Sequence, residues 1–413
     1  MTGWLRVFRV ARPGGPTLAN LWESLAHFRG RVWLRFQPRP GFIGLERGEA
    51  EARGLSVMVA RLAEALVRKW DLKKGERAVV AARHPLEFLV LSTALARAGG
   101  ITVPFVESWF SRAGEVVRAA GATLALVVPS LLEEREDLRE GLSPVERRIV
   151  VGRDGAGGWE SLFREAEGSS GFFLPYTLKP GNVVLLLPRP EGDGMPRMVM
   201  VTNSSLFFPL RLLPVARYWS ARGGGVTLLS FNPGETSGWA AAMLGLFAGR
   251  QAMVGRGASG GVAASGGGLL VTDASTTAGL FRGHGGVPRV AGWINLGSEI
   301  ILGAGKGGPA ARAIPALARR FIHLYDLEGC CSAFTAWAGD PRTLGAWDKT
   351  GLLIPGNRVR LSGGGAGEVL LRGPSVFPGY WNDLEETLRR WEGGWLHTGV
   401  EATRRGPWMR VVD

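Results

Sequence analysis

Two patterns of apolar residues alternate along the first third of the chain. Within residues 55–70, apolar side chains recur every three or four positions, which predicts a helix with one buried face. The continuous apolar run at 78–82 is typical of a strand buried on both faces. The alternation then repeats, with predicted helices at 86–98 and 111–120 and predicted strands at 101–104 and 123–128. This spacing indicates βαβ units and a parallel sheet.

The alternation continues through the middle of the chain and changes near residue 345. Predicted strands lie at 183–187, 226–231, 269–272, 290–296 and 321–325, and predicted helices at 239–247 and 309–320. Beyond residue 345, short apolar segments at 359–361 and 368–372 stand between glycine-rich turns, which indicates a small β-rich unit. Glycine-rich stretches at 255–268 and 303–308 predict surface loops.

The predicted fold class is therefore α/β, with two parallel-sheet βαβ-type subdomains packed together and a small C-terminal β-rich subdomain of the distorted-barrel type. We place the first subdomain at residues 1–180, the second at 181–345 and the small one at 346–413. A chain of 413 residues is too long for one simple core, which agrees with this division.

Composition narrows the class of protein. Hydrophobic residues make up 46% and charged residues 21% of the chain, which indicates a folded globular protein. The formal net charge of +13 would suit nucleic acid, an anionic membrane surface or small anions, and a general bias toward arginine explains it as well. The arginines are scattered and form no basic run with interleaved aromatic residues, so we expect no nucleic-acid partner.

Three features bear on the location of the protein. The two cysteines, Cys330 and Cys331, are adjacent and unsuited to a structural disulfide, which favours a reducing cytoplasm. No apolar run reaches the roughly 18 residues that a transmembrane helix needs. Arg6, Arg9 and Arg12 interrupt the apolar residues of the N-terminal arm, which leaves no signal-peptide core. We predict a cytoplasmic protein, and a peripheral contact of this arm with a membrane surface stays open.

A run of motifs near the end of the chain carries a family resemblance. The sequence GEVLLRGPSVFPGYWND at 367–383 is followed by GWLHTG at 394–399. Their order and spacing resemble the signature of AMP-forming acyl-CoA synthetases, which belong to the adenylate-forming superfamily. Upstream, KGERAV at 74–79 and the stretch from PLEF at 85–88 to AGGITVP at 98–104 resemble earlier motifs of this family. The resemblance covers most of the chain.

This resemblance implies a function. Members of the family bind ATP and a carboxylic acid, form an acyl-adenylate and release pyrophosphate, and many then transfer the acyl group to coenzyme A. It therefore implies ATP with Mg²⁺, coenzyme A as a co-substrate, and a carboxylic acid such as a fatty acid as the substrate. It also implies a small domain after Asp413 that carries a catalytic lysine, and a separate polypeptide with that domain is a candidate partner.

The family binds the phosphates of ATP in a loop of glycine and hydroxyl residues, where backbone N–H groups and a lysine meet the negative charge. The matching stretch here is 189–198, and its candidate nucleotide contacts are Gly192, Gly194 and Arg197. The family's hydroxyl residues are absent, and Pro190 lacks an N–H group. Glu191 and Asp193 would repel a triphosphate, at a cost on the order of 4 kcal/mol per close contact.

Three further segments supply candidate nucleotide contacts. NLGSE at 295–299 matches the turn that contacts adenine, YDLE at 325–328 lies near the family's magnesium glutamate, and HTG at 397–399 precedes its ribose contact. The candidate contacts are Gly297, Ser298, Glu299, Tyr325, Asp326 and Thr398. Without a gap in the alignment, Gly329 replaces the family's magnesium glutamate, whereas with a one-residue deletion Glu328 supplies the carboxylate that Mg²⁺ requires. Val400 replaces the ribose-binding aspartate, which removes roughly 1.5–3 kcal/mol of hydrogen bonding.

The acyl side of the resemblance rests on two residues. Asn232 replaces a histidine that is common in related enzymes, and Trp239 begins the helix that lines their acyl pocket, although core packing explains Trp239 equally well. Two other motifs fail. Thr236 in GETSG stands where a hydrolase nucleophile elbow needs serine. No Ser or Thr follows Lys306 in GAGKGG, as a P-loop requires.

The sequence leaves two hypotheses from different classes. The first is an AMP-dependent acyl-CoA synthetase-like adenylation domain whose catalysis is impaired by the changed phosphate loop, the metal register and Val400. The alternative is a non-catalytic pseudoenzyme that binds an acyl group, a nucleotide or a partner subunit.

Overall fold

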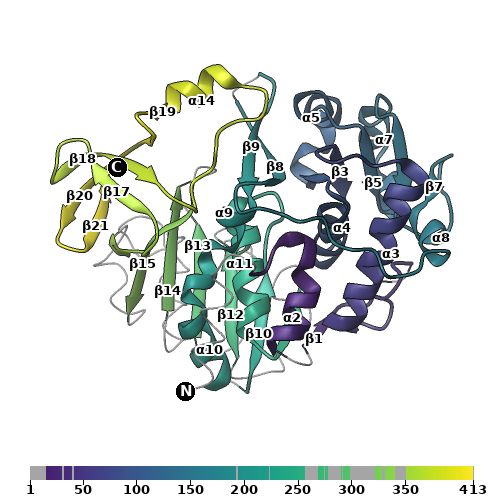
Figure 1. Ribbon diagram of the computed structural model, residues 1–413, viewed down its shortest axis with the longest axis horizontal. Coiled ribbons are helices and arrows are strands. Elements are labelled where there is room, and N and C mark those ends of the chain that lie inside the picture. The colour runs from purple at the N-terminus through teal and green to yellow at the C-terminus, as the bar shows by residue number, and fades with distance from the viewer. Residues whose placement is uncertain are drawn as a thin grey trace.

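A computed structural model gives the architecture of the chain. It describes residues 15–29, 32–39, 41–191, 194–222, 224–255, 268–273, 275–277, 290, 292–297, 321–327, 331–339 and 350–412. Within these residues the strands form two parallel-rich sheets, and antiparallel strands extend from one end (Figure 1). The predicted α/β fold class is confirmed.

The first sheet has seven strands in the order β7-β6-β5-β3-β4-β8-β9. Its strands are β3 (Arg77–Ala81), β4 (Ile101–Phe105), β5 (Leu124–Val127), β6 (Arg147–Val150), β7 (Glu160–Ser161), β8 (Val183–Arg189) and β9 (Arg197–Thr202). The strands pair in parallel except for β9, which forms an antiparallel hairpin with β8. The main helices beside them are α3 (Ala52–Trp70), α4 (Pro85–Ala98), α5 (Ala113–Ala120), α6 (Pro129–Glu134), α7 (Glu136–Gly141) and α8 (Leu162–Glu167).

Local sequence fixes the ends of helix α4 between β3 and β4. Its first residue is Pro85, whose ring suits the first helical position. His84 caps this end, and the Glu87 side chain accepts the backbone N–H of His84 in return. Gly99 ends the helix with a left-handed φ of 89°. These signals explain why the predicted boundaries at 86 and 98 nearly match the observed ones.

The second sheet has fourteen strands, and its parallel part comes from the middle of the chain. The parallel strands are β1 (Trp33–Phe36), β11 (Gln251–Val254), β10 (Val226–Ser230), β12 (Leu269–Asp273), β13 (Gly292–Gly297) and β14 (Phe321–Leu327). Strand β2 (Glu49–Glu51) pairs antiparallel with β1 at one edge. Helices α2 (Leu21–Arg29), α10 (Leu213–Arg222) and α11 (Thr236–Ala248) pack near this part (Figure 1).

The C-terminal strands are antiparallel and continue from the other edge of this sheet. Their order from β14 is β15-β16-β21-β20-β18-β17, and β19 pairs with β20. They are β15 (Cys331–Gly339), β16 (Thr350–Leu353), β17 (Arg358–Leu361), β18 (Ala366–Arg372), β19 (Trp391–Glu392), β20 (Trp395–Arg405) and β21 (Trp408–Val412). Helix α14 (Leu384–Arg390) lies between β18 and β19 in the sequence. This part matches the predicted small β-rich unit.

The subdomain boundaries stay predictions, and the sheets exchange segments across the first of them. Strands β1 and β2, from within residues 1–180, pair in the second sheet. Strands β8 and β9, from beyond residue 180, pair in the first. The sequence did not predict β9 as a strand. The predicted helix 309–320 and most of both glycine-rich stretches lie outside the described residues.

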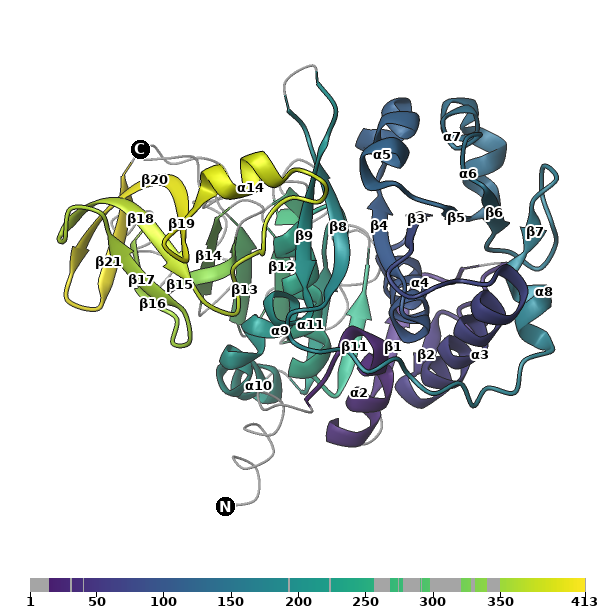
Figure 2. The same cartoon turned by 45° about the horizontal axis from the view of Figure 1, so that its top comes forward.

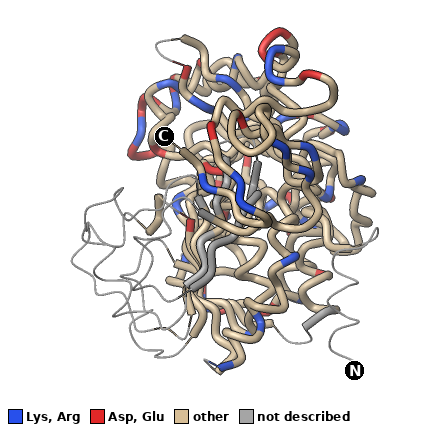
Figure 3. The backbone as a smooth tube through the Cα atoms, turned by 90° about the vertical axis from the view of Figure 1, so that its left-hand side faces the viewer, with Lys and Arg blue, Asp and Glu red and all other residues tan. Residues whose placement is uncertain are grey.

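Charge and helix length give two further observations. Lys and Arg are spread over many elements, and acidic residues lie among them (Figure 3). Among the described helices, none is long and apolar enough to cross a membrane.

Helix α11 forms the centre of the second subdomain's core. All thirteen of its residues are buried, as expected for a helix that is apolar all round. Gly238 allows this helix to approach the backbone that follows β10, because a Cβ atom there would stand 2.0 Å from the Asn232 carbonyl oxygen. The close approach fixes the position of Asn232.

We therefore expect Gly238→Ala to lower the free energy of unfolding by about 2 kcal/mol or more, since backbone atoms would have to move. Gly54→Ala in helix α3 is the matched control, because nothing lies within 4 Å of its added Cβ. It should leave stability unchanged or raise it by up to about 1 kcal/mol. Urea unfolding of both variants makes the measurement, and equal stabilities would contradict the packing described.

Candidate functional site

A cavity of about 570 Å³ lies where the carboxyl ends of strands from both sheets meet. The first sheet contributes residues that follow β3 and β4, and the second contributes residues that follow β10 and β12. The carboxyl ends of parallel strands are where α/β folds usually bind ligands. The volume lies in the range of small-molecule sites.

The polar wall of the cavity is organised by Asp273, which ends β12 and is fully buried. Its Oδ2 accepts the backbone N–H of Asn232 at 2.7 Å and the hydroxyl of Thr276 at 2.8 Å. Its Oδ1 accepts the hydroxyl of Ser275 at 2.8 Å and the backbone N–H of Thr276 at 2.9 Å. One carboxylate thereby joins the ends of β10 and β12.

Glu235 lies behind this wall, directly before helix α11. The Asn232 amide donates to Glu235 Oε1 at 3.1 Å, and the Ser237 hydroxyl donates to Oε2 at 3.3 Å. Burial raises the pKa of Glu235, and the charge of Asp273 raises it further, while Arg189 and hydrogen bonds oppose the shift. The wall therefore contains two acidic groups that resist carrying charge together.

The rest of the cavity is apolar inside and charged at its rim. The apolar lining includes Phe88, Val106, Phe110, Leu131 and Phe231. At the rim, Arg83 pairs with Glu134, and Arg135 lies 3.4 Å from Glu107 and 2.7 Å from Asp137. Both lining arginines are therefore already paired with carboxylates.

The two predicted substrate-pocket residues occupy different places. Asn232 lines the cavity. Trp239 is fully buried in helix α11, and its indole N–H donates to the Pro233 carbonyl at 2.7 Å. Its ring lies 5.9 Å from the ring of Phe231, which does line the cavity. Trp239 therefore supports the cavity from behind.

The predicted phosphate loop joins β8 to β9, and the hairpin of these two strands forms one edge of the first sheet (Figure 2). At the loop, the Gly194 N–H donates to the Glu191 carbonyl at 2.9 Å, and the Gly194 carbonyl accepts from Arg112. Arg112 ends the short 3-10 helix η2 (Glu107–Arg112), part of which lines the cavity. The phosphate loop and the cavity therefore share a supporting segment.

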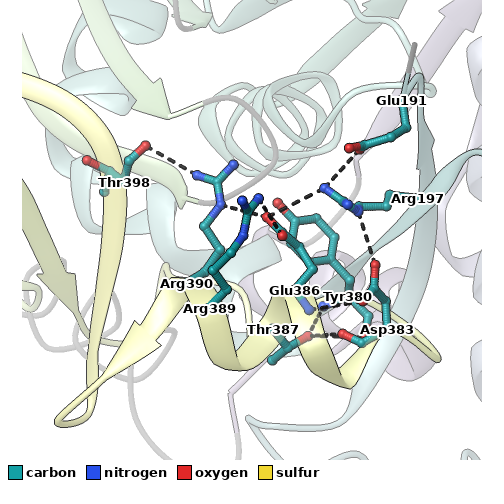
Figure 4. A network of polar contacts seen from close by, with 9 residues as sticks. All are labelled: Glu191, Arg197, Tyr380, Asp383, Glu386, Thr387, Arg389, Arg390 and Thr398. Atoms are coloured by element: carbon teal, nitrogen blue, oxygen red, sulfur yellow. Dashed lines mark hydrogen bonds and ion pairs between the residues drawn. The ribbon is translucent and has the colours of Figure 1, made fainter.

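Arg197, the candidate phosphate contact, is bound by carboxylates of the chain itself (Figure 4). Its Nη1 lies 2.9 Å from Glu191 and 3.5 Å from Glu386, and its Nε lies 3.0 Å from Asp383. Its guanidinium also stands over the Tyr380 ring, 5.5 Å from the centroid. Asp383 and Glu386 belong to the start of α14, so Arg197 links the hairpin to that helix.

Glu386 is the centre of the charge network on α14. It is 6% exposed and also pairs with Arg389 at 2.5 Å and Arg390 at 3.1 Å. The hydrogen bond from Arg389 lowers the pKa of Glu386 most, Arg390 and Arg197 lower it further, and burial opposes them, which gives about 2. Glu386 is therefore ionised at neutral pH.

Thr398 stands at the far end of the same network. Its carbonyl lies 3.5 Å from Arg390, and its hydroxyl donates to the Val369 carbonyl at 2.7 Å (Figure 4). The Val400 N–H donates back to that hydroxyl at 3.2 Å. The structure thus brings Arg197 and Thr398 together through Glu386 and Arg390, while the Thr398 hydroxyl supports its own strand.

The other predicted nucleotide residues are described in part or not at all. Gly297 and Tyr325 are paired neighbours in strands β13 and β14, and Asp326 follows Tyr325. Four predicted residues lie outside the described part of the chain, namely Gly192, Ser298, Glu299 and Glu328. Within the described ranges, no group of three or more His, Cys, Asp or Glu side chains could hold a metal ion.

These contacts test how well the loop suits a triphosphate. Phosphate groups need unshared positive charge and free N–H donors. Arg197 instead meets three carboxylates, and the loop contributes Glu191 to that set. The positive charge of Arg197 is therefore shared among carboxylates of the chain itself. The cavity, by contrast, has the volume and lining for an organic ligand.

Sequence reasoning missed the partners of Arg197 and most of the cavity wall. The signal for Glu386 was local, because Asp383 caps a helix in which Glu386, Arg389 and Arg390 have pair-forming spacing. The signal for Ser275 and Thr276 was their place just after a predicted strand end.

We expect Glu191→Gln to tighten ATP binding about fivefold, which corresponds to about 1 kcal/mol. The substitution removes a negative charge from the phosphate loop and one carboxylate from Arg197. Calorimetric titration with ATP measures the change. Glu385→Gln on exposed α14 is the control of equal charge and should bind ATP as the wild type does. Unchanged affinity in Glu191→Gln would show that Glu191 does not compete with phosphate.

The low pKa of Glu386 predicts a dependence of stability on pH. Because its pKa is lower in the folded state, ionised Glu386 stabilises the fold above about pH 4.5, and this contribution is lost as the pH falls toward 2. Glu386→Gln should therefore cost on the order of 2 kcal/mol at pH 7 and much less near pH 2. Urea unfolding at both pH values measures this difference. A cost that does not depend on pH would contradict the assignment.

Comparison with known proteins adds to this geometry. No protein-family model matches the sequence. An anthranilate–CoA ligase from Pseudomonas aeruginosa is 43% identical over 61 residues, which are 13% of this chain and 12% of that protein. Fatty acyl-CoA synthetase B from Dictyostelium discoideum is 44% identical over 48 residues, which are 11% of this chain and 7% of that protein. These sequence matches therefore span only a small part of the relatives.

Solved structures match nearly the whole chain. A Rhodopseudomonas palustris protein described as a long-chain fatty-acid CoA ligase has a TM-score of 0.75 and 18% identity, over 96% of this chain and 98% of that one. The amide bond synthetase McbA from Marinactinospora thermotolerans has a TM-score of 0.74 and 16% identity, over 96% and 79% of the chains. ATP-bound MatB from Rhodopseudomonas palustris has a TM-score of 0.70 and 20% identity, over 95% and 78%.

This chain therefore has the fold of the acyl-CoA ligases and related adenylate-forming enzymes, as the resemblance of its sequence predicted.

Proposed function

We propose that this chain is an adenylation domain of the acyl-CoA ligase type, which binds a carboxylic acid in the cavity and activates it with ATP inefficiently. The single observation that carries the proposal is the cavity at the carboxyl ends of β3, β4, β10 and β12, in a fold whose solved relatives include CoA ligases. The proposed acid-binding side has a cavity of about 570 Å³. The proposed impairment lies on the nucleotide side.

The nucleotide side supports the proposed impairment through two features. Arg197 is engaged by Glu191, Asp383 and Glu386, so a triphosphate must displace them. Val400 supplies no acceptor at the position where the resemblance implies a ribose contact. Both features are expected to weaken the binding of ATP. They lie on the side of the site where adenylating enzymes stabilise the charge that develops during the reaction.

ATP and coenzyme A are the proposed co-substrates, since an ATP-bound structure and CoA ligases are among the relatives. The proposed nucleotide contacts are Gly192, Gly194, Arg197, Gly297, Ser298, Glu299, Tyr325, Asp326 and Thr398, with Glu328 as the proposed Mg²⁺ ligand. In the described part, Arg197 and Thr398 already lie in one network (Figure 4).

A second function is favoured by the same Arg197 contacts. A chain whose phosphate loop is occupied by its own carboxylates can keep the cavity and dispense with the nucleotide. It would then be a non-catalytic protein that binds the acid alone.

Acid-dependent exchange of pyrophosphate into ATP separates the two functions. We expect slow exchange by the wild-type chain with a suitable carboxylic acid, and about tenfold faster exchange by Val400→Asp, which restores a charged acceptor for the ribose hydroxyls. Val400→Asn is the control of similar size without the charge and should gain less. No exchange by the wild type or by either variant, with the acid still bound, would reject the adenylation domain in favour of the binding protein.

A further inference from the structure

The hydroxyl groups of Ser275 and Thr276 donate their protons to buried carboxylates and not into the cavity. Asp273 receives a hydrogen bond from each of its four partners, two of which are backbone N–H groups. The hydroxyl of Thr276 must therefore donate to Asp273, since a carboxylate that only accepts cannot supply the proton. The hydroxyl of Ser275 lies beside the carboxylates of Asp273 and Glu235 and donates to one of them. Both residues also line the cavity.

On the Asp273 side of the cavity, this arrangement leaves only acceptor capacity for a ligand. A hydroxyl has one proton and two lone pairs, so Thr276 Oγ1 keeps its lone pairs after it donates to Asp273. Ser275 Oγ accepts from the Asn232 amide at 3.2 Å and keeps one lone pair. The Asn232 amide is itself committed, because it also donates to Glu235 and its oxygen accepts the Gly234 N–H at 2.9 Å.

The opposite side of the cavity offers a ligand a different environment. Phe88 and Phe110 give it an apolar surface, and Phe231, which follows β10 of the second sheet, extends that surface. The charged groups at its rim, Arg83 and Arg135, are paired with carboxylates. An apolar group thus fits against the phenylalanines, with the acceptors of the second sheet facing it.

We propose that the cavity selects carboxylic acids whose apolar part carries a hydroxyl or amino group, and that Thr276, helped by Ser275, accepts the hydrogen bond from that group. The proposal rests on the proposed function, in that it names the substrate class for the same cavity. Thr276 is a specificity-determining residue here. Its acceptor character is set by Asp273, which positions it without touching the ligand.

Physical chemistry sets the size of the effect. A ligand without a donor leaves the Thr276 lone pairs buried and unpaired, whereas a ligand with a donor satisfies them. A neutral hydrogen bond of this kind corresponds to about a three- to tenfold change in affinity. Methoxy analogues are the sharpest comparison, because they keep the oxygen atom and lose the proton.

The experiment measures dissociation constants by calorimetry, in the absence of nucleotide, for benzoate, 3-hydroxybenzoate, 3-aminobenzoate and 3-methoxybenzoate. We expect the hydroxy and amino acids to bind the full chain about three- to tenfold more tightly than the methoxy acid. Thr276→Val should bring this ratio close to one and leave the affinity for the methoxy acid within about twofold. Equal binding of hydroxy and methoxy acids by the wild type would overturn the proposal.

Two further variants protect the result against a local loss of structure. Thr276→Ser keeps the hydroxyl and should keep the preference, whereas a preference lost in both variants at an unchanged thermal midpoint would overturn the role of the hydroxyl. Thr403→Val makes the same change as Thr276→Val at an exposed position of β20 outside the cavity lining and should change nothing. A preference that survives in Thr276→Val would overturn the role of Thr276.

One other ligand is a necessary comparison. Pantetheine carries amide N–H and hydroxyl donors, and pantetheine affinity that falls in Thr276→Val while the benzoates do not respond would overturn the assignment to the acid. The acid titrations contain no ATP, so their result does not depend on nucleotide binding. A failure of pyrophosphate exchange would therefore count against the proposed function and not against this inference. Equal dissociation constants for all four acids would overturn this inference and leave the proposed function untouched.

Discussion

The salt-bridge network centred on Arg197 and Glu386 is the constraint on which the nucleotide side of the structure depends. It joins the β8–β9 hairpin of the first sheet to helix α14 and, through Arg390, to strand β20 of the C-terminal part. Three arginines face three carboxylates, so the network is neutral without any ligand. A buried group such as Glu386 is stable as a charge only because these partners surround it. The orientation of α14 and the position of the phosphate loop follow from the same contacts.

The cavity depends on a second carboxylate with a different role. Among the described residues, no arginine forms a hydrogen bond with Asp273, and backbone N–H groups and hydroxyls compensate for its burial. It holds the segments after β10 and β12 in place and fixes the direction of two hydroxyl protons. Glu235, whose pKa is raised beside it, adds to the acidic character of the wall. The two carboxylates therefore have different roles. Glu386 neutralises the charge of arginines, and Asp273 orients neutral polar groups.

Local sequence patterns predicted several of the helices and strands that lead into the cavity and the charge network. They could not predict which strands pair when the strands lie far apart in the sequence. Strand β3 and helix α4 followed from an apolar run and from caps at Pro85 and Gly99, which are local signals. The pairing of β1 with β11 depends on residues more than two hundred positions apart, and no period in the sequence encodes it. The family resemblance placed Asn232 in a substrate pocket, and Asn232 lines the cavity. Two of the three carboxylates that meet Arg197, Asp383 and Glu386, lie nearly two hundred residues beyond it, so Arg197 looked like an available phosphate contact.

In the proposed adenylation domain, the two centres together favour binding of the acid over binding of the nucleotide. Any triphosphate gains contacts with Arg197 only after the contacts with Glu191 are lost, so its net affinity is the difference between two similar interactions. In the proposed complex, an acid with a donor group meets Thr276 lone pairs that no described side chain satisfies, so its hydrogen bond breaks no contact within the described part of the protein. In this proposal, binding of the triphosphate requires that contacts within the protein break, whereas binding of the acid does not. A domain built in this way would be filled by its organic ligand first, and nucleotide binding would be the limiting step for any adenylation.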